Sequence, residues 1–547
     1  MRWPGWLHGE RRLLAEALAL ALAVAAAHLL LRLSAGFLVG ALNDDGVYVV
    51  LGKAIAEGDG YRSIHLVGAP AHLRYPPGLP LLLAIPWALG GSLGAVRATV
   101  GVLNLLATAT AAGLLWWVGR RRLGLAPWPL AVCAASPFVL DGTTQYYNIP
   151  LTEPYLVLGW AAALVIAYPL VDAGALTPRR IGRAVALGLV LAATTLFRSA
   201  GAVLLPAILL ALALHRRWRE TVACAAGILL PLAAWAVLRA AWTAQAPVSS
   251  HPDDVGYWRW LGVEGPLALV GYAGRTVAMH AVEYLVKLAS YLVSSRWIGV
   301  GLVGAATAAA GLACVRWWRA HTALVLTTLA ASALTLLWPF AQGRLLLPLL
   351  PFLGLLAAGT VDLGLRRVPA NLRRVAPAAL GFVVLAVTLR QVELREAAAR
   401  AYQTGVLPPP ADLSPILTLA VRSRFIARVV GMVQERTAPA DRVMVDAPAA
   451  VYLYTGRRTV SGQPTESGLA PSVFHVPGRY LAERILADSV TVVVWAPPAP
   501  ALEQDLAAVA TRCPGVLMRE ATAPAMFYRV TRNEACLRKR VLEGGAR

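Results

Sequence analysis

The sequence predicts a mainly α fold: a polytopic transmembrane helical bundle followed by a small C-terminal extracytoplasmic α/β domain. Of its 547 residues, 58% are hydrophobic and 14% are charged, and the mean hydropathy is +0.61. A soluble protein of this size cannot bury so much apolar surface in one core. Apolar stretches, many of them 17 to 24 residues long, recur through the first 390 residues, and that length crosses the hydrocarbon core of a bilayer.

The basic residues predict how the chain is oriented in the membrane. Lys and Arg number 50 and Asp and Glu number 29, which gives a net charge of +21. In a soluble protein this balance indicates nucleic acid, but short basic clusters between apolar stretches are typical of cytoplasmic loops. The clusters are Arg11–Arg12, Arg120–Arg122, Arg179–Arg183, Arg216–Arg219, Arg316–Arg319 and Arg366–Arg374. We therefore expect no nucleic-acid partner and a multi-pass protein of the cytoplasmic (inner) membrane with a cytoplasmic amino terminus.

Placing every basic cluster in the cytoplasm predicts about 11 to 13 spans and an external carboxyl terminus. The segment 13–33 is too long for the apolar part of a signal peptide, so we expect a retained span. The other predicted spans are 95–118, 126–141, 152–172, 181–197, 199–214, 220–242, 297–315, 321–338, 343–362 and 375–391. The proline-rich segment 76–91 is expected to be a broken or re-entrant helix. The segment 271–295 is expected to lie at the outer interface, with a pair of spans as the alternative.

Two domains are predicted. Residues 1–392 form the membrane domain, whose first outer loop is 34–94, and residues 393–547 form the extracytoplasmic α/β domain. Pro408–Pro410 reads as a linker. Strands are expected at 443–445, 490–495 and 526–530, and helices at 425–436 and 504–512.

Two adjacent carboxylates, Asp44 and Asp45, follow the first span in the first outer loop. Charge near a bilayer is costly, which favours a chemical role. Arg74, in the same loop, carries a planar fork of donors that suits phosphate. A transferase needs an acid that accepts a proton from the acceptor group. It also needs a cation that neutralises the leaving phosphate. The alternatives are that one acid is a helix N-cap and that Arg74 anchors the chain at the interface.

Three further charged residues belong to predicted outer segments. Glu153 opens an apolar helix, where either catalysis or the helix dipole accounts for it. Arg198 lies in an outer hairpin, where interfacial anchoring is the alternative. Arg344 starts an apolar helix, the unfavourable end for a cation, which favours a phosphate partner.

The sequence gives weaker indications of a metal site and of a disulfide. His65 and His72 are metal-ligand candidates beside Asp44, although two histidines in a loop more often face solvent. No Walker loop, GxGxxG, HExxH, GxSxG or paired CxxC motif occurs in a suitable context. Cys513 and Cys536 would face an oxidising compartment and are expected to form a disulfide that joins the last two strands.

The order of these motifs resembles that of the GT-C glycosyltransferases, which include protein O-mannosyltransferases and the lipid A aminoarabinose transferase. Asp44, Asp45 and Tyr48 resemble the first-loop motif of that superfamily, and Thr152-Glu153-Pro154 resembles its second acidic site. Three further elements match: Arg74-Tyr75-Pro76-Pro77-Gly78 resembles a Lys/Tyr-Pro-Pro element, Arg344-Leu345-Leu346-Leu347-Pro348 an Arg-Tyr-x-x-Pro element, and Tyr454-Thr455-Gly456-Arg457 a recurrent piece of bacterial C-terminal domains. The chain departs from the pattern at Arg74, which keeps the charge, and at Leu345, which removes an aromatic contact to the donor.

The resemblance implies transfer of a hexose or pentose from a polyprenyl-phosphate donor on the outer face of the membrane. Asp44 would be the general base or a metal-bound acid, assisted by Asp45 and Glu153, with Mg²⁺, Mn²⁺ or Zn²⁺ as the metal. Donor phosphate would bind Arg74, Arg198 and Arg344, and donor or acceptor would contact Tyr48, Tyr75, His72 and Arg62. The acceptor, which is a protein, a lipid or a polysaccharide, stays open. The alternatives are a transporter or lipid flippase, and a non-catalytic assembly partner.

Overall fold

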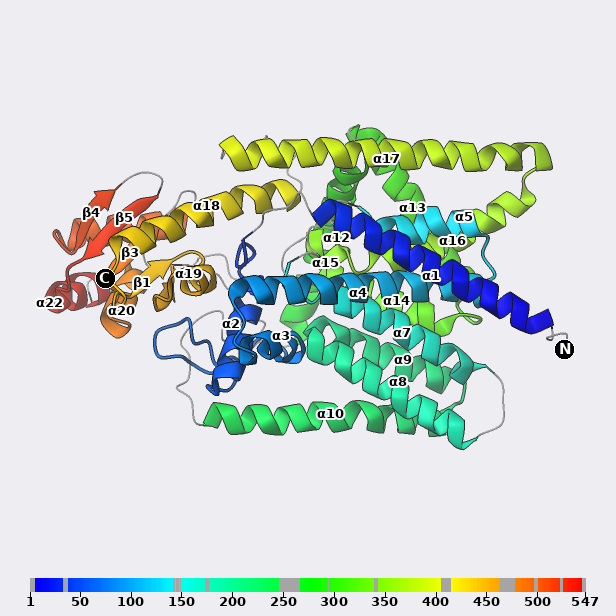
Figure 1. Cartoon of the computed structure of the whole chain (residues 1–547), viewed down its shortest axis with the longest axis horizontal. Helices are drawn as coiled ribbons and strands as arrows, with labels where there is room; N and C mark the ends of the chain where they lie inside the picture. Colours follow the sequence, from blue (N-terminus) through cyan, green and yellow to red (C-terminus); the bar gives the residue numbers. More distant parts are fainter. Residues whose placement is uncertain are drawn as a thin grey trace.

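The computed structural model describes residues 5–32, 38–140, 143, 147, 149–172, 177–244, 266–293, 295–338, 343–404, 415–462, 478–495, 500–521 and 525–543. Long helices run side by side in a bundle, and a small mixed sheet with its own helices lies beyond one end of it (Figure 1). The predicted fold class is confirmed: the chain is a multi-pass helical membrane protein that carries a C-terminal α/β unit.

Six helices in the described part of the chain are long and apolar enough to cross a bilayer. They are α1 (Gly5–Arg32), α4 (Leu93–Arg121), α7 (Glu153–Val171), α8 (Pro178–Phe197), α10 (Trp218–Ala244) and α13 (Arg296–Trp317). Shorter apolar helices add α3 (Gly78–Ala88), η3 with α9 (Ser199–Val203, Leu204–Leu214) and α14 (Thr322–Leu337). The remaining helices of the bundle are α2 (Asp44–Glu57), α5 (Pro127–Leu130) with η1 and η2 (Ala131–Ala135, Ser136–Phe138), α12 (Pro266–Leu292), α15 (Gly343–Leu346), α16 (Leu350–Arg367) and α17 (Ala370–Thr404). The predicted total of 11 to 13 spans therefore stays a prediction.

The two ambiguous segments are both helical. In the proline-rich segment, α3 has 11 residues, with Pro77 as its N-cap and Pro86 inside it. A helix of that length rises about 16 Å, which is too short for a crossing. α12 has 27 residues and carries the ion pair Lys287–Glu283 at 2.6 Å.

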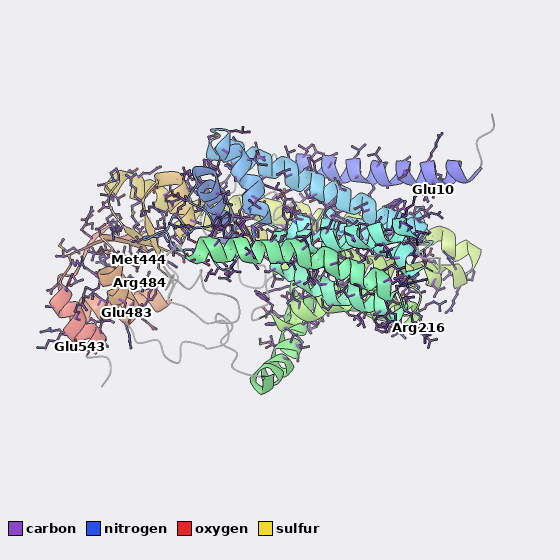
Figure 2. All side chains as sticks on the ribbon, turned by 90° about the horizontal axis from the view of Figure 1, so that it is seen from below. Glu10, Arg216, Met444, Glu483, Arg484 and Glu543 are labelled. Carbon is purple, nitrogen blue, oxygen red and sulfur yellow. A yellow bond between two sulfur atoms is a disulfide. The ribbon has the colours of Figure 1, made fainter. Side chains whose placement is uncertain are left out.

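The basic clusters gather at the end of the bundle that is far from the sheet. Arg120 pairs with Glu16, Arg121 with Glu10, Arg122 with Asp172 and Arg180 with Glu220, at 2.8 to 3.2 Å. Figure 2 shows Glu10 and Arg216 toward one end of the molecule and Met444, Arg484 and Glu543 toward the other. The orientation of the chain in the membrane stays a prediction.

The C-terminal unit is a five-stranded sheet in the order β2-β1-β3-β5-β4. Its strands are β1 (Val443–Val445), β2 (Thr459–Ser461), β3 (Val492–Trp495), β4 (Leu517–Ala521) and β5 (Met526–Val530), and β1 runs parallel to β2 and β3. Its helices are α18 (Pro415–Arg436), α19 (Pro448–Thr455), α20 (Arg479–Ala487), α21 (Pro500–Arg512) and α22 with η6 (Glu534–Cys536, Leu537–Glu543). The three predicted strands are present, and β2 and β4 are additional. Helix α17 continues past the predicted domain boundary at 392 as far as Thr404, and the predicted linker Pro408–Pro410 lies outside the described residues.

A disulfide joins Cys513 to Cys536, whose Cα atoms are 5.9 Å apart. The bond links the residue after α21 to α22, so it brackets the β4–β5 hairpin instead of joining the two strands. Pairing of β4 with β5 carries the two flanking segments to the same place, which is why the cysteines meet.

Candidate active site at the start of helix α2

Asp44 is the first residue of α2, and residues distant in sequence surround its carboxylate. The Tyr75 hydroxyl donates a hydrogen bond of 2.5 Å to Oδ1, and the Arg344 guanidinium donates to Oδ2. Side-chain exposure is 20% for Asp44 and 16% for Arg344, so the pair is mostly but not completely buried. Two of the three segments that the sequence analysis selected for phosphate binding, those of Arg74 and Arg344, therefore meet at the predicted catalytic acid.

The charges around Asp44 keep its carboxyl group ionised. Burial by itself raises the pKa of Asp44, but the positive charges of Arg344 and Arg74 and the hydrogen bond from Tyr75 outweigh burial and hold the pKa below its ordinary value. Arg74 also stacks near Tyr75, with its guanidinium carbon 5.5 Å from the ring centre. Asp44 is thus a carboxylate under the influence of two guanidinium groups.

A second ion pair lies next to the first. Arg198 Nη1 is 2.9 Å from Glu153 Oε1 and donates a 2.9 Å hydrogen bond to Thr152 Oγ1. Glu153 is fully buried at the start of α7. The negative charges of Asp44 and Glu153 both act on the Arg344 guanidinium, which places the two ion pairs as neighbours.

The assembled cluster holds two acids and three arginines: Asp44, Glu153, Arg74, Arg198 and Arg344. Three guanidinium groups gather here, and guanidinium groups suit an anionic ligand. Helices α2, α3 and α15 lie toward the end of the bundle that carries the sheet (Figure 1). Polar chemistry is therefore concentrated at one end, opposite the basic clusters.

Asp45 has different contacts from Asp44. It is fully buried, and its oxygens accept hydrogen bonds from the backbone N–H groups of Gly40 at 2.6 Å and Leu42 at 3.0 Å. Burial, with a contribution from the neighbouring Asp44 charge, raises the pKa of Asp45 to about 6. The N-cap alternative applies to neither acid, because Asn43 is the N-cap of α2 and Asp45 accepts from backbone N–H groups that precede the helix. The catalytic role predicted for Asp45 stays a prediction, and its contacts also give it a role in positioning the loop before α2.

Two aromatic residues of the predicted first loop, His72 and Tyr48, contact Tyr75. His72 Nε2 accepts a hydrogen bond of 3.0 Å from the Tyr75 backbone N–H, so Nδ1 carries the proton and donates to Ser63 Oγ at 3.1 Å. The ring centre of Tyr48 lies 4.9 Å from that of Tyr75. Both His72 and Tyr48 are buried. The structure describes a backbone bridge between Arg62 and Ala71 in this loop, and a ligand-binding role for Arg62 stays a prediction.

The residues around Asp44 do not fit a divalent metal. Its two oxygens accept hydrogen bonds from Tyr75 and Arg344, and the positive charges of Arg344 and Arg74 act on it. Within the described ranges, no group of three His, Cys, Asp or Glu side chains is placed to bind a metal ion. His72 binds loop groups, as shown above, and does not face Asp44 as a ligand.

The sequence analysis did not single out Arg239, Tyr147 or the role of Tyr454. Arg239 Nη2, from α10, donates a 2.6 Å hydrogen bond to the Leu73 carbonyl, directly before Arg74. A lone arginine inside the predicted span 220–242 was the available signal. Tyr147 is buried within the electric field of Glu153 and Arg198. Most of its outer segment, 141–148, lies outside the described residues.

The arrangement of the helices and the C-terminal unit is similar to that of solved membrane proteins. Two solved structures carry that likeness. ArnT from Cupriavidus metallidurans, crystallised bound to undecaprenyl phosphate, matches with a TM-score of 0.52 and 14% identity, over 93% of this chain and 97% of ArnT. The oligosaccharyltransferase AglB from Archaeoglobus fulgidus, in complex with an inhibitory peptide and a dolichol-phosphate, matches with a TM-score of 0.51 and 14% identity, over 87% of this chain and 69% of AglB.

At this level of identity the comparisons show a shared fold. No protein-family model matches the sequence, and no curated protein matches it. The roles of individual side chains must therefore be argued from the geometry of this chain.

Proposed function

We propose that this protein is an integral-membrane glycosyltransferase. It transfers a sugar from a polyprenyl-phosphate-linked donor to an acceptor on the outer face of the cytoplasmic membrane. One observation carries the proposal: Asp44 is held between Arg344 and the Tyr75 hydroxyl, with Arg74 and the Glu153–Arg198 pair beside it, at one end of a membrane bundle.

Recognition of the donor is assigned to the arginines. Two similar folds were crystallised with undecaprenyl phosphate and with a dolichol-phosphate, which supports a lipid-linked phosphate as the ligand class here. Arg344 and Arg74 would bind the phosphate, since a guanidinium fork matches two phosphate oxygens. Arg198 already contacts Glu153 and Thr152. We therefore propose that it contributes positive charge near the phosphate and helps to shape the site.

The reaction breaks one bond and forms one. The bond between the sugar C1 and the phosphate oxygen breaks, and its electron pair leaves with the polyprenyl phosphate. A lone pair of the acceptor hydroxyl or amine forms the new bond to C1, and the acceptor proton passes to the Asp44 carboxylate. Arg344 and Arg74 stabilise the negative charge that develops on the leaving phosphate.

The Asp44–Arg344 pair explains how a carboxylate of low pKa can accept a proton. In the free protein Arg344 stabilises the Asp44 anion. A donor phosphate that binds Arg344 brings negative charge, weakens this stabilisation and raises the pKa of Asp44. Asp44 becomes a better base when the donor is in place, which couples proton transfer to donor binding.

The proposal assigns no step to a metal, because the donor set around Asp44 does not fit one. Transfer measured after treatment with EDTA tests this directly. Loss of activity that Mg²⁺, Mn²⁺ or Zn²⁺ restores would favour the metal-bound acid that the sequence analysis considered.

The decisive experiment compares two variants of the first loop. Asp44→Asn removes the proposed proton acceptor while keeping its shape, and Asp59→Asn removes an exposed carboxylate of the same loop. Mass spectrometry of envelope glycans and glycolipids should show loss of the product with Asp44→Asn and wild-type product with Asp59→Asn. Normal product with a folded Asp44→Asn protein overturns the assignment.

The transporter or flippase alternative is less well supported. A transporter places polar groups near the middle of the bilayer, between related repeats. Helices α2 and α15, which carry Asp44 and Arg344, lie toward the end of the bundle that carries the sheet (Figure 1). A reconstituted protein that moves undecaprenyl phosphate across vesicles without forming a glycosylated product would favour this alternative.

A further inference from the structure

The backbone directly before Asp44 has an unusual conformation. Asn43 has φ 68° and ψ −61°, and the Asp44 N–H donates a 2.9 Å hydrogen bond to the Leu42 carbonyl. These values define a γ-turn with positive φ at its centre, which is rare and strained. Asn43 is the N-cap of α2, yet its side chain forms no capping hydrogen bond. The turn therefore needs support from elsewhere, because strained backbone persists where its surroundings hold it.

Support comes from the C-terminal unit. The Tyr454 hydroxyl, from α19, accepts a 3.1 Å hydrogen bond from the Val39 backbone N–H. On the other side of the turn, Asp45 accepts from the N–H groups of Gly40 and Leu42. Tyr454 and Asp45 together satisfy three backbone donors of one short loop.

Helix α19 also packs against the backbone of this loop. A Cβ atom added to Gly40, which has φ +93°, would lie 2.5 Å from the Ala450 Cβ. A Cβ added to Gly46 would lie 3.0 Å from the Ala449 Cβ. Glycine at these two positions lets α19 approach the turn and the start of α2 more closely than a side chain would allow.

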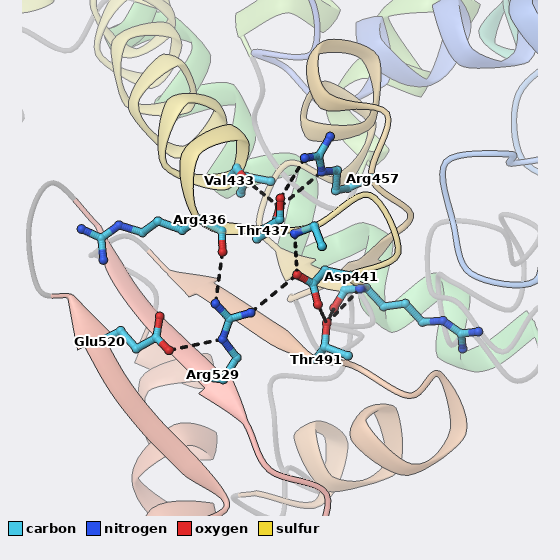
Figure 3. Close-up of polar contacts among 10 residues, drawn as sticks. Val433, Arg436, Thr437, Asp441, Arg457, Thr491, Glu520 and Arg529 are labelled. Carbon is cyan, nitrogen blue, oxygen red and sulfur yellow. Dashed lines mark hydrogen bonds and ion pairs between the residues drawn. The ribbon is translucent and has the colours of Figure 1, made fainter.

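Helix α19 is fixed in its own unit. Arg457, just after α19, donates to the Thr437 carbonyl at 2.8 Å and to the Thr455 carbonyl at 2.7 Å, which ties α19 to the end of α18 (Figure 3). Arg529 continues this network, with hydrogen bonds to the Arg436 carbonyl and to Glu520.

A second attachment joins the same two parts of the chain. Thr459 N–H donates to the His65 carbonyl at 2.8 Å, and Val67 N–H donates to the Thr459 carbonyl at 3.1 Å. The first loop thereby extends the sheet beyond β2. The C-terminal unit therefore contacts the first loop at two places, this sheet edge and the Asn43 turn.

We infer that the C-terminal unit positions the reaction centre. Tyr454 is a positioning residue that holds the turn 39–44 in its strained form, so that Asp44 points at Arg344 and Tyr75. The inference rests on the proposed function, since it assumes that Asp44 accepts the acceptor proton. It adds that α19 sets the rate of transfer without touching either substrate.

Hydrogen exchange in the full-length protein in detergent tests the physical part. Tyr454→Phe removes one hydroxyl and keeps the ring. Tyr480→Phe is the matched control, because its hydroxyl donates to Ser461 in the same unit, away from the turn. Amides of the 38–46 peptide should exchange about tenfold faster in Tyr454→Phe and at the wild-type rate in Tyr480→Phe. Equal exchange in Tyr454→Phe and wild-type protein overturns the inference.

Kinetics test the catalytic part. Proteoliposomes are supplied with the polyprenyl-phosphate-sugar pool extracted from source membranes, and initial rates are measured. Tyr454→Phe should lower kcat about tenfold, because a small misplacement of a catalytic group is costly. The KM for donor and the affinity for undecaprenyl phosphate should stay within about twofold of wild type, since the arginines are untouched. A change confined to KM overturns the inference, as does an unchanged kcat.

Two further variants separate the possible failures. If Asp44→Asn retains transfer, the proposed function fails whatever Tyr454→Phe does. If Asp44→Asn is inactive and Tyr454→Phe has wild-type kcat, the positioning role alone fails. Should Tyr454→Phe lower the Tm of the whole protein, Ala450→Gly removes the methyl group that faces Gly40 and is expected to reproduce the selective loss of kcat.

Discussion

Asp44 and Arg344 are 300 residues apart in the chain, yet they form an ion pair in which each side chain is at least four-fifths buried. Charges in such a pair depend on each other, because a buried charge without its partner is costly. The pair therefore links the first outer loop to α15, and the site is complete when both segments are in place.

Replacing Arg344 by lysine should weaken donor binding even though the positive charge is kept. We expect Arg344→Lys to lower the affinity for undecaprenyl phosphate by about tenfold or more, since lysine cannot form the bidentate contact. Thermal stabilisation of the purified protein by titrated undecaprenyl phosphate measures this. Arg97→Lys, an exposed arginine at the start of α4, is the control, and equal affinity in the two variants would contradict the assignment.

The Glu153–Arg198 pair should behave as a coupled unit in unfolding. Arg198→Met leaves the fully buried Glu153 without its cation, and we expect a loss of about 3 to 5 kcal/mol. The double variant Glu153→Gln with Arg198→Met should lose less than the sum of the single changes, because no isolated charge stays buried. A double-mutant cycle of unfolding free energies in detergent checks this, and additive losses would show that the two residues are independent.

Asp45 should make stability depend on pH. Its folded-state pKa of about 6 lies above the ordinary 3.8, so the native state holds a proton that the unfolded state has released. This contribution is fully present below pH 3.8 and is lost as the pH rises to about 6. Asp45→Asn removes the titration. The Tm difference between wild type and variant should shrink or change sign from pH 4 to pH 6.5, and a constant difference counts against the buried carboxyl.

The stability of the protein should depend on how readily the residue at position 43 adopts a positive φ. Glycine adopts positive φ without strain, so Asn43→Gly is expected to keep the unfolding free energy within about 1 kcal/mol of wild type. Valine is strongly disfavoured there, and Asn43→Val should cost about 1 to 3 kcal/mol. Thermal unfolding in detergent distinguishes them, and equal stability of both variants would rule out a strained turn.

The disulfide should stabilise the C-terminal unit. Its cysteines are separated by 23 residues, and a closed loop of that size contributes about 3 kcal/mol. Cys536→Ser should lower the unfolding free energy of the unit by about that amount, and a reducing agent should do the same to wild type. Protease resistance of the C-terminal unit with and without reductant provides the measurement, with wild-type resistance in Cys536→Ser as the contrary result.

Much of the site could be predicted from local sequence because each residue broke a local rule. Asp44 carries charge beside an apolar span, and Arg344 is a cation at the amino end of an apolar helix. The separate roles of Asp44 and Asp45 could not be predicted. Adjacent residues of identical chemistry differ when one faces Arg344 and the other faces the backbone of the preceding loop.

The sequence by itself determined that this is a multi-pass helical membrane protein with a terminal α/β unit, since hydropathy and length depend on local composition. It also singled out all five charged residues of the cluster, Asp44, Glu153, Arg74, Arg198 and Arg344. Tertiary structure decided which of them are in contact and which of the two adjacent acids binds the preceding loop. It also decided that Tyr454 contacts the turn before Asp44. Most of these contacts join residues that are tens to hundreds of positions apart. The pattern of side chains along one helix does not indicate which distant residues that helix will contact.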